Sequence, residues 1–442
     1  MADQATWSEA HVRRLFWRAG FGATPAEAAR FVHAGKDATI KWLLSSGSGT
    51  LRGAPPSVEG KPLDPTNEWG HDVLWWLDRM VRSDRPLVEK MTLFWHDHFA
   101  TRDQDTPLML RQNRMLRARS LGSFPALLRS VTRDDAMQLF LSLADSSKEA
   151  PNENFARELM ELFTLGHGYS ERDIREAARA LTGFRARWSN RGFGGTYYDR
   201  SAHDARVKRI FGKRGRYDWQ DVLELVCSHR SHAPFIVGKL WSYFTPMPLD
   251  RVTRKRLVER YRRSGLKIKP VVGAILAHPA LYSDLERPDM VKSPVVFVAG
   301  ALRLVGRGVD RGDWAWLLDN MGQALFRPPS VAGWEGGPAW LSTNTIRARF
   351  TAVNYLFDDG GPLAVANGAI SSSLSPAEAV ALARRSVGDQ PTSAETNATL
   401  ERMVVRFFAD LKPDDWRRQQ RADMCQRVLR HLLLSGPEAQ LH

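Results

Sequence analysis

The chain has 442 residues, 43% of them hydrophobic and 25% charged, which is the composition of a globular protein with enough length for a large core. Its formal net charge is +14, but the basic residues are spread along the chain without a nucleic-acid-binding motif, so we expect no nucleic-acid partner. The two cysteines, Cys227 and Cys425, exclude a disulfide framework and a thiolate zinc site.

Helical periodicity dominates the chain. Ser8 and the pair Thr24-Pro25 are helix-start signals, because a capping hydroxyl and a proline in the first turn favour a helix N-terminus. Ser170 opens another helix, with Asp173 completing a capping box. Apolar stripes at helical spacing predict further helices at 68–82, 85–101, 152–165, 170–183, 218–228, 234–244, 251–263, 270–277, 293–305 and 342–356.

One segment, 184–211, breaks the helical pattern. It holds glycines, the pair Tyr197-Tyr198 and a basic–apolar stretch at 207–211, which predict two short strands forming a small hairpin with a loop at 201–205. Strands do not otherwise alternate with helices. The predicted fold class is therefore mostly α, a multi-helical single large domain with a small β-hairpin insertion and a C-terminal helical subdomain.

We divide the chain into a main helical domain, 1–358, a linker rich in Gly, Ser and Ala, 359–375, and a C-terminal helical subdomain, 376–442. No run of about 18 apolar residues is present, so no membrane span is expected. The first residues lack the apolar core of a signal peptide. This predicts a cytoplasmic protein, or an exported one if a leader has been removed.

A first candidate for chemistry is the segment Phe94-Trp95-His96-Asp97-His98. His98 shares a helix face with apolar residues, and His96 lies about 200° around the same helix. The two imidazoles could bind one ion if the helix ends or distorts there. The alternative is that each is a core histidine bonded to a backbone carbonyl.

A second candidate is the predicted helix 152–165. On a helical wheel Asn154, Glu158 and Glu161 form one polar stripe beside the buried face. Carboxylates at such a border are expected to be paired or to coordinate a metal, since a lone buried carboxylate is costly. The alternative is a salt-bridge ladder, because Glu153, Arg157 and Glu161 follow at intervals of four residues.

A third candidate is His203-Asp204, followed by Lys208, in the loop between the predicted strands. A loop His-Asp pair can supply a metal ligand with its orienting carboxylate, or a general base with its acid. A simple turn is the alternative, because Asp is common in turns.

Pro328-Pro329 and Gly333–Gly337 mark an irregular connection that is rich in tryptophan and precedes the predicted helix 342–356. Trp334, Trp340, Asn344 and Arg347 could line a substrate pocket, or they could form a packed corner. Signatures of dinucleotide, nucleotide and serine-hydrolase sites are missing from the sequence.

Several of these stretches together resemble a known bacterial family, the domain of unknown function 1800. The matching motifs are KMTLFWHDHFAT, NENFARELMELFTLG, YSERDIREAARALTGF, the HD…K of His203-Asp204 and Lys208, and FRPPSVAGWEGGPAWLSTNTIRARF. The resemblance runs from about Ala10 to Leu356, and the family more often has Asn where this chain has Asp97. It implies a helical protein, often exported and encoded beside a sulfatase-like protein, which is a candidate partner.

The resemblance supplies no reaction, so the functional hypothesis comes from the residues. It is a metal-dependent enzyme, hydrolytic or oxidative, in which His98, Glu158 and His203 approach one another around a divalent zinc, iron or manganese ion. The full set comprises the metal ligands His96, His98, Glu158, Glu161 and His203, the catalytic residues Arg157, Asp204 and Lys208, and the substrate-binding residues Asn154, Trp334, Trp340, Asn344 and Arg347. The main alternative is a non-catalytic binding or assembly protein whose motif residues form a structural polar network. A copper oxidase-like protein is a lesser alternative.

Overall fold

The computed structural model describes residues 7–45, 47, 49–102, 105–190, 192–357, 363, 365, 368–412 and 414–442. This part of the chain is mostly α-helical, and its strands occur only in three two-stranded antiparallel sheets. The predicted fold class is thereby confirmed. None of the described helices is both long enough and apolar enough to cross a lipid bilayer.

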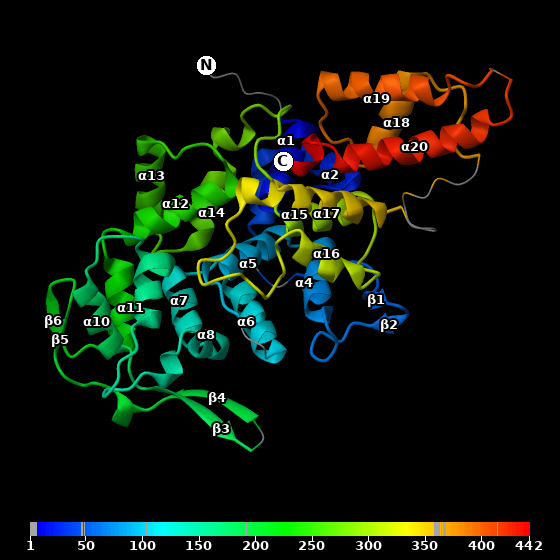
Figure 1. Ribbon diagram of the computed structural model, residues 1–442. Coiled ribbons are helices and arrows are strands. Elements are labelled where there is room, and N and C mark those ends of the chain that lie inside the picture. The colour runs from blue at the N-terminus through cyan, green and yellow to red at the C-terminus, as the bar shows by residue number, and fades with distance from the viewer. Residues whose placement is uncertain are drawn as a thin grey trace.

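The helices and strands follow one another along the chain as shown in Figure 1. The first half contains α1 (Glu9–Ala19), α2 (Pro25–Ala34), α3 (Lys36–Leu43), α4 (His71–Arg82), α5 (Pro86–His98), α6 (Thr106–Arg119), α7 (Phe124–Thr132), α8 (Asp135–Phe140), α9 (Asn154–Glu158) and α10 (Glu171–Ala180). The second half contains α11 (Trp219–Ser228), α12 (His232–Phe244), α13 (Arg251–Arg263), α14 (Ile268–Leu276), α15 (Pro294–Leu304), α16 (Asp313–Asn320), α17 (Thr343–Asn354), α18 (Pro376–Ser386), α19 (Ala394–Phe407) and α20 (Arg418–Ser435). The strands are β1 (Ser57–Val58), β2 (Lys61–Pro62), β3 (Phe184–Ser189), β4 (Gly192–Tyr198), β5 (Lys208–Ile210) and β6 (Lys213–Gly215).

Helix starts form where the sequence places capping residues. Thr24 and Glu27 bond reciprocally at the start of α2, with the Glu27 amide donating to the Thr24 hydroxyl over 3.2 Å and the Thr24 amide to the Glu27 carboxylate over 3.0 Å. Ser170 and Asp173 form the same box at the start of α10. Both satisfy backbone amides that the helix leaves without an internal acceptor.

The β structure differs from the predicted single hairpin. β4, which contains Tyr197 and Tyr198, pairs with the preceding strand β3. β5, which starts at Lys208 in the basic–apolar stretch, pairs with the following strand β6. The intervening residues 201–205 do not act as a hairpin turn, because Asp204 and His203 are hydrogen-bonded to Thr182, two residues beyond the end of α10. Two separate hairpins therefore replace the predicted one.

Two hydrophobic clusters form the core, and α5 contributes to both. One cluster gathers side chains from α1–α3, α7 and α9–α14, together with Phe94 and Trp95 of α5. The other gathers side chains from α4 and α15–α20, together with Leu93 of α5. In Figure 1, α5 accordingly lies near the middle of the molecule, between the green helices and the yellow-to-red ones. A residue at the end of α5 can thus reach either half of the protein.

The C-terminal helices share the second cluster with the main body. Apolar residues of α18, α19 and α20 belong to the same cluster as those of α4 and α15. The Lys292 ammonium donates to the carbonyl of Ala439 over 2.8 Å, and Val291 forms an isolated antiparallel bridge with Leu441. The predicted linker, 359–375, lies partly outside the described residues, and the division into domains stays a prediction.

Candidate functional site

The two histidines of α5 face different parts of the protein. The His96 Nε2 atom accepts a hydrogen bond from the amide of Phe326 over 3.1 Å. Its ring contacts Trp76 and Trp334, with centroids 5.1 and 5.6 Å apart. Burial lowers the pKa of His96 to about 3, so the imidazole is neutral and serves as an acceptor for the backbone of a distant segment.

His98 is bonded to the other half of the molecule. Its Nε2 atom lies 3.0 Å from the carbonyl oxygen of Phe163, and its ring packs against Phe94 and Phe99. Burial, reinforced by the charge of Lys239, lowers the pKa of His98 to about 3. The neutral ring therefore donates to a carbonyl, which is the alternative that the sequence left open.

The helix that His98 meets is not the regular α-helix expected at 152–165. It begins as α9 and widens into a π-helix over Leu159–Thr164. Two histidines form hydrogen bonds with its last backbone carbonyls. His98 bonds to the carbonyl of Phe163, and the Nδ1 atom of His232 lies 3.2 Å from the carbonyl of Thr164. Widening changes the number of residues per turn, so wheel positions computed at 100° per residue fail beyond Glu158.

The polar stripe of this helix faces outward. Asn154 and Glu161 are exposed, and Glu158 is half-buried. Arg157 joins Glu171 through two hydrogen bonds of 2.8 and 2.9 Å and Glu153 through one of 3.1 Å. Burial raises the pKa of Glu158, and the neighbouring Glu161 carboxylate raises it further. The Glu153–Arg157 pair is the first step of the salt-bridge ladder considered as an alternative.

The third motif is a compact network around Asp204. This carboxylate, whose side chain is 0% exposed, accepts from Arg179 Nε over 2.8 Å and from Arg206 over 2.7 Å. Hydrogen bonds from Arg206 and Arg179 hold its pKa well below the usual range. His203 Nδ1 lies 3.0 Å from the carbonyl of Thr182. The predicted catalytic acid is therefore a fixed anion between two guanidinium groups.

Lys208 completes this network. Its ammonium donates to the carbonyls of Asp204, Arg206 (3.1 Å) and Tyr217 (2.8 Å). All three ammonium protons thus have an acceptor, which is what allows a lysine that is 1% exposed to remain in the interior.

The three histidines predicted as ligands therefore have separate partners. His96, His98 and His203 each bond to a different backbone group. Within the described ranges, no three His, Cys, Asp or Glu side chains lie close enough together to hold a metal ion. The predicted approach of His98, Glu158 and His203 around one ion is not supported by this arrangement.

A different set of motif residues does converge, around a cavity of about 310 Å³ that we call the aromatic pocket. Its walls come from α5, α12, the start of α15 and residues 328–341, which we call the Trp-rich loop. The lining residues are Lys90, Leu93, Phe94, Asp97, Lys239, Ser242, Tyr243, Met290, Val291, Ser293, Val296, Gln323, Trp334, Glu335, Gly336, Gly337, Trp340 and His442. Asn344 and Arg347, which the sequence grouped with the tryptophans, are exposed on α17.

The Trp-rich loop is docked onto the end of α5 through Asp97. The amide of Trp334 donates to the Asp97 carboxylate over 2.9 Å. Gly333 has a φ of +82°, and a Cβ at this position would overlap the carboxylate and the carbonyl of Asp97. Only glycine permits this close approach. The contact explains why a histidine and an aspartate adjoin in the α5 motif, since His96 holds Phe326 and Asp97 holds Trp334.

The polar groups of the pocket have altered acidities. Burial raises the pKa of Asp97 to about 6, against the opposing effects of the Trp334 amide and Lys239. Burial lowers the pKa of Lys90 to about 7, and the nearby Arg18 acts in the same direction. Titratable groups shifted toward neutrality in a cavity mark candidate functional sites.

Lys90 is not among the site residues predicted from the sequence, although a signal for it was present. Lys90 lies three residues after Leu87 and four before Phe94, so helical spacing places it on the apolar face of α5. A lysine on such a face must find acceptors or sit beside a cavity. Tyr243 and His442 carry no comparable signal, because only tertiary packing brings them to α5.

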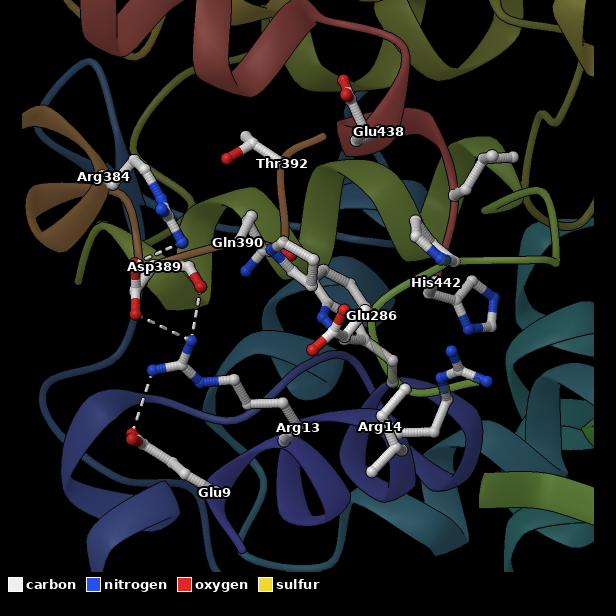
Figure 2. Close-up of a pocket in the computed structure, with 16 residues that line it drawn as sticks. Glu9, Arg13, Arg14, Glu286, Arg384, Asp389, Gln390, Thr392, Glu438 and His442 are labelled. Carbon is white, nitrogen blue, oxygen red and sulfur yellow. Dashed lines mark hydrogen bonds and ion pairs between the residues drawn. The ribbon is translucent and has the colours of Figure 1, made fainter. Parts of the chain in front are cut away.

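A second cavity, of about 420 Å³, lies between α1 and the C-terminal segments (Figure 2). Its charges are paired: Arg13 contacts Glu9 and Asp389, and Arg384 also contacts Asp389. His442 lines both this cavity and the aromatic pocket. Because its guanidinium groups are already bonded to carboxylates, this cavity is the weaker candidate for a binding site.

Comparison with known proteins identifies the family. Neither a curated protein nor a solved structure matches the chain. A family described as "Protein of unknown function (DUF1800)" matches residues 14–441. The match corrects the expectation that the resemblance ends near Leu356, since it includes α18–α20, which pack into the same core as α4 and α15. The chain therefore belongs to the DUF1800 family.

Proposed function

We propose that the protein binds a small organic ligand with an apolar, aromatic body in the aromatic pocket. The main support is that two motifs more than 200 residues apart, at Phe94–His98 and Trp334–Trp340, both contribute residues to the lining of one cavity. A concave cavity that combines aromatic side chains with polar groups is the usual form of a small-molecule site. The buried Lys90 and the half-buried Asp97 are two of its polar groups, and the others are Lys239, Ser242, Tyr243, Ser293, Gln323, Glu335 and His442.

The remaining motif residues have structural roles, and several of them hold the segments that surround this site. His96 and Asp97 hold the Trp-rich loop, while His98 and His232 hold the widened helix that flanks α5. The Asp204 network lies around α10. This distribution favours the alternative in which the motif histidines and carboxylates form structural networks, combined with a ligand site elsewhere.

A screen of neutral aromatic fragments by saturation-transfer NMR tests the proposal. We expect hits whose signal is lost in Trp340→Ala, because this side chain forms a wall of the cavity. The matched control is Trp416→Ala, which removes a tryptophan that is 82% exposed and is not among the lining residues. Finding no fragment whose binding depends on Trp340 and not on Trp416 would contradict the proposal.

The metal-dependent enzyme stays a prediction with its own test. Metal analysis of the purified protein measures zinc, iron, manganese or copper directly. A stoichiometric metal that Glu158→Gln or His98→Ala removes would restore the metal hypothesis and count against a purely structural role for these residues.

A further inference from the structure

The ammonium of Lys90 is poorly accommodated. Its side chain is 3% exposed. Among the residues that the structure describes, its acceptor is the carbonyl of Trp17 at the long distance of 3.4 Å. The rings of Phe21 and Tyr243 lie 5.5 and 5.7 Å from the nitrogen. A buried ammonium with one weak hydrogen bond is unfavourable compared with the neutral amine.

The charges that surround Lys90 make its ammonium form still less favourable. Arg18 of α1 lowers its pKa, and Lys90 in turn lowers that of His442. The acid of this region, Asp289, is bonded to Arg18 and also contacts Arg14 at 3.6 Å. Helix α12, which packs against α5, places the Tyr243 hydroxyl near Lys90, where it donates to the Lys90 backbone carbonyl over 3.0 Å. Asp97 lies two turns further along α5.

Two other buried lysines differ from Lys90 in their surroundings. Lys208 donates to three carbonyls, as described above. Lys292 donates to Ala439 over 2.8 Å, lies 3.9 Å from the Trp17 ring centroid, and is not among the lining residues of the aromatic pocket. Lys90 alone of the three combines burial, a single long hydrogen bond and a place in the wall of that cavity.

We propose that Lys90 is a carbonyl-reactive amine, and that the ligand of the aromatic pocket is an aldehyde or ketone with which it forms an imine. This inference rests on the proposed function and names the ligand class of the same site. Desolvated lysines that lack an anionic partner are the ones that act as nucleophiles.

The reaction needs no further reactant. The amine lone pair attacks the carbonyl carbon, a C–N bond forms, and one amine proton moves to the carbonyl oxygen to give a carbinolamine. The hydroxyl then leaves with the second amine proton as water, and the C=N bond forms. Amine and carbonyl become imine and water without a change in oxidation state.

Reductive trapping on the full-length protein tests this inference. The protein is treated with benzaldehyde and sodium cyanoborohydride at neutral pH, and the benzylated lysines are located by peptide mass spectrometry. At pH 7 about half of an amine with a pKa near 7 is neutral, against roughly one in a thousand for an ordinary lysine. We expect Lys90 to be labelled at least about tenfold faster than Lys255, which is exposed on α13 and is not among the residues that line the cavity.

Lys292 is the internal control for access, because burial also lowers its pKa to about 7. Labelling of Lys90 but not of Lys292 supports a reaction that occurs in the cavity. Equal labelling of Lys90, Lys292 and Lys255, or none at Lys90, would overturn the inference. These comparisons are made within the wild-type chain, so they do not depend on a variant that might misfold.

A second aldehyde separates this inference from the proposed function. Formaldehyde is too small to need the tryptophan walls, so Trp340→Ala should reduce labelling of Lys90 by benzaldehyde severalfold and leave labelling by formaldehyde unchanged. If both aldehydes label Lys90 equally in the wild type and in Trp340→Ala, the aromatic site is wrong. If aromatic fragments bind without any labelling of Lys90, the imine alone is wrong.

Discussion

Two regions of this protein bury a lysine from a family motif, and they differ in the hydrogen-bond acceptors that surround the ammonium group. Around Lys208, the chain turns so that three backbone carbonyls point at the ammonium and two arginines fix the adjacent Asp204. Around Lys90, aromatic rings, one distant carbonyl and a cavity take their place. In the first region every proton of the ammonium group has an acceptor, so Lys208 has a structural role. The second region leaves the ammonium with one long hydrogen bond, on a residue that lines a cavity, and this is where ligand chemistry is possible.

Removing each lysine gives the sharpest test of this comparison. Lys208→Met leaves three carbonyls without their donor and should lower the free energy of unfolding by about 3 kcal/mol or more. Lys90→Met removes a poorly solvated cation and should leave the free energy of unfolding within about 1 kcal/mol of the wild type, or raise it. Urea unfolding measures both. Similar losses in the two variants would show that Lys90 is as well satisfied as Lys208.

The Trp-rich loop offers a test based on two glycines. Gly333 and Gly337 both have positive φ, but a Cβ at Gly333 would collide with Asp97 whereas a Cβ at Gly337 meets open space. Gly333→Ala should cost about 2–3 kcal/mol and abolish fragment binding, because it displaces Trp334. Gly337→Ala carries only the backbone penalty of about 1 kcal/mol. Thermal unfolding with the fragment screen distinguishes them, and equal effects would argue against the docking role of Asp97.

Asp97 should leave a signature in the pH dependence of stability. Its pKa is raised to about 6 in the folded protein, above the unfolded value near 3.9, so the folded state binds the proton more tightly. Stability from this group is therefore greatest below about pH 4 and falls as the pH rises to about 6. Relative to Asp97→Asn, the wild type should lose about 1–2 kcal/mol over this range.

Unfolding experiments on both proteins at each pH isolate the Asp97 contribution, since all other titrating groups are common to the two. A difference that grows in the opposite direction, with the wild type gaining stability as the pH rises, would mean that Asp97 is held as a stabilised anion.

The smallest effect is expected at the polar stripe of the widened helix. Glu158→Gln removes a half-buried carboxylate whose pKa is raised by burial and further by the neighbouring Glu161. The free energy of unfolding should change by no more than about 0.5 kcal/mol. A loss of several kcal/mol, measured by urea unfolding, would show that Glu158 has a partner of the kind first expected for a metal ligand.

The local features of the sequence predicted much of the fold. The helix starts at Thr24-Pro25 and Ser170 form as expected, because a cap depends only on residues within one turn. The mostly α class follows from the spacing of apolar residues. Beyond Glu158, however, the helical wheel fails, since nothing in the apolar spacing signals that the helix widens and offers its carbonyls to His98 and His232.

What the sequence alone determined is therefore the mostly α class, the helix caps and the family motifs, all of which depend on neighbours in the chain. What only the tertiary structure decided is the partner of each buried polar group. Lys208 finds its acceptors within nine residues of itself, at Asp204, Arg206 and Tyr217. The environment of Lys90 comes from α1, α12 and the Trp-rich loop, brought together because α5 lies between two cores. Whether a buried charge is satisfied or left reactive depends on such distant contacts.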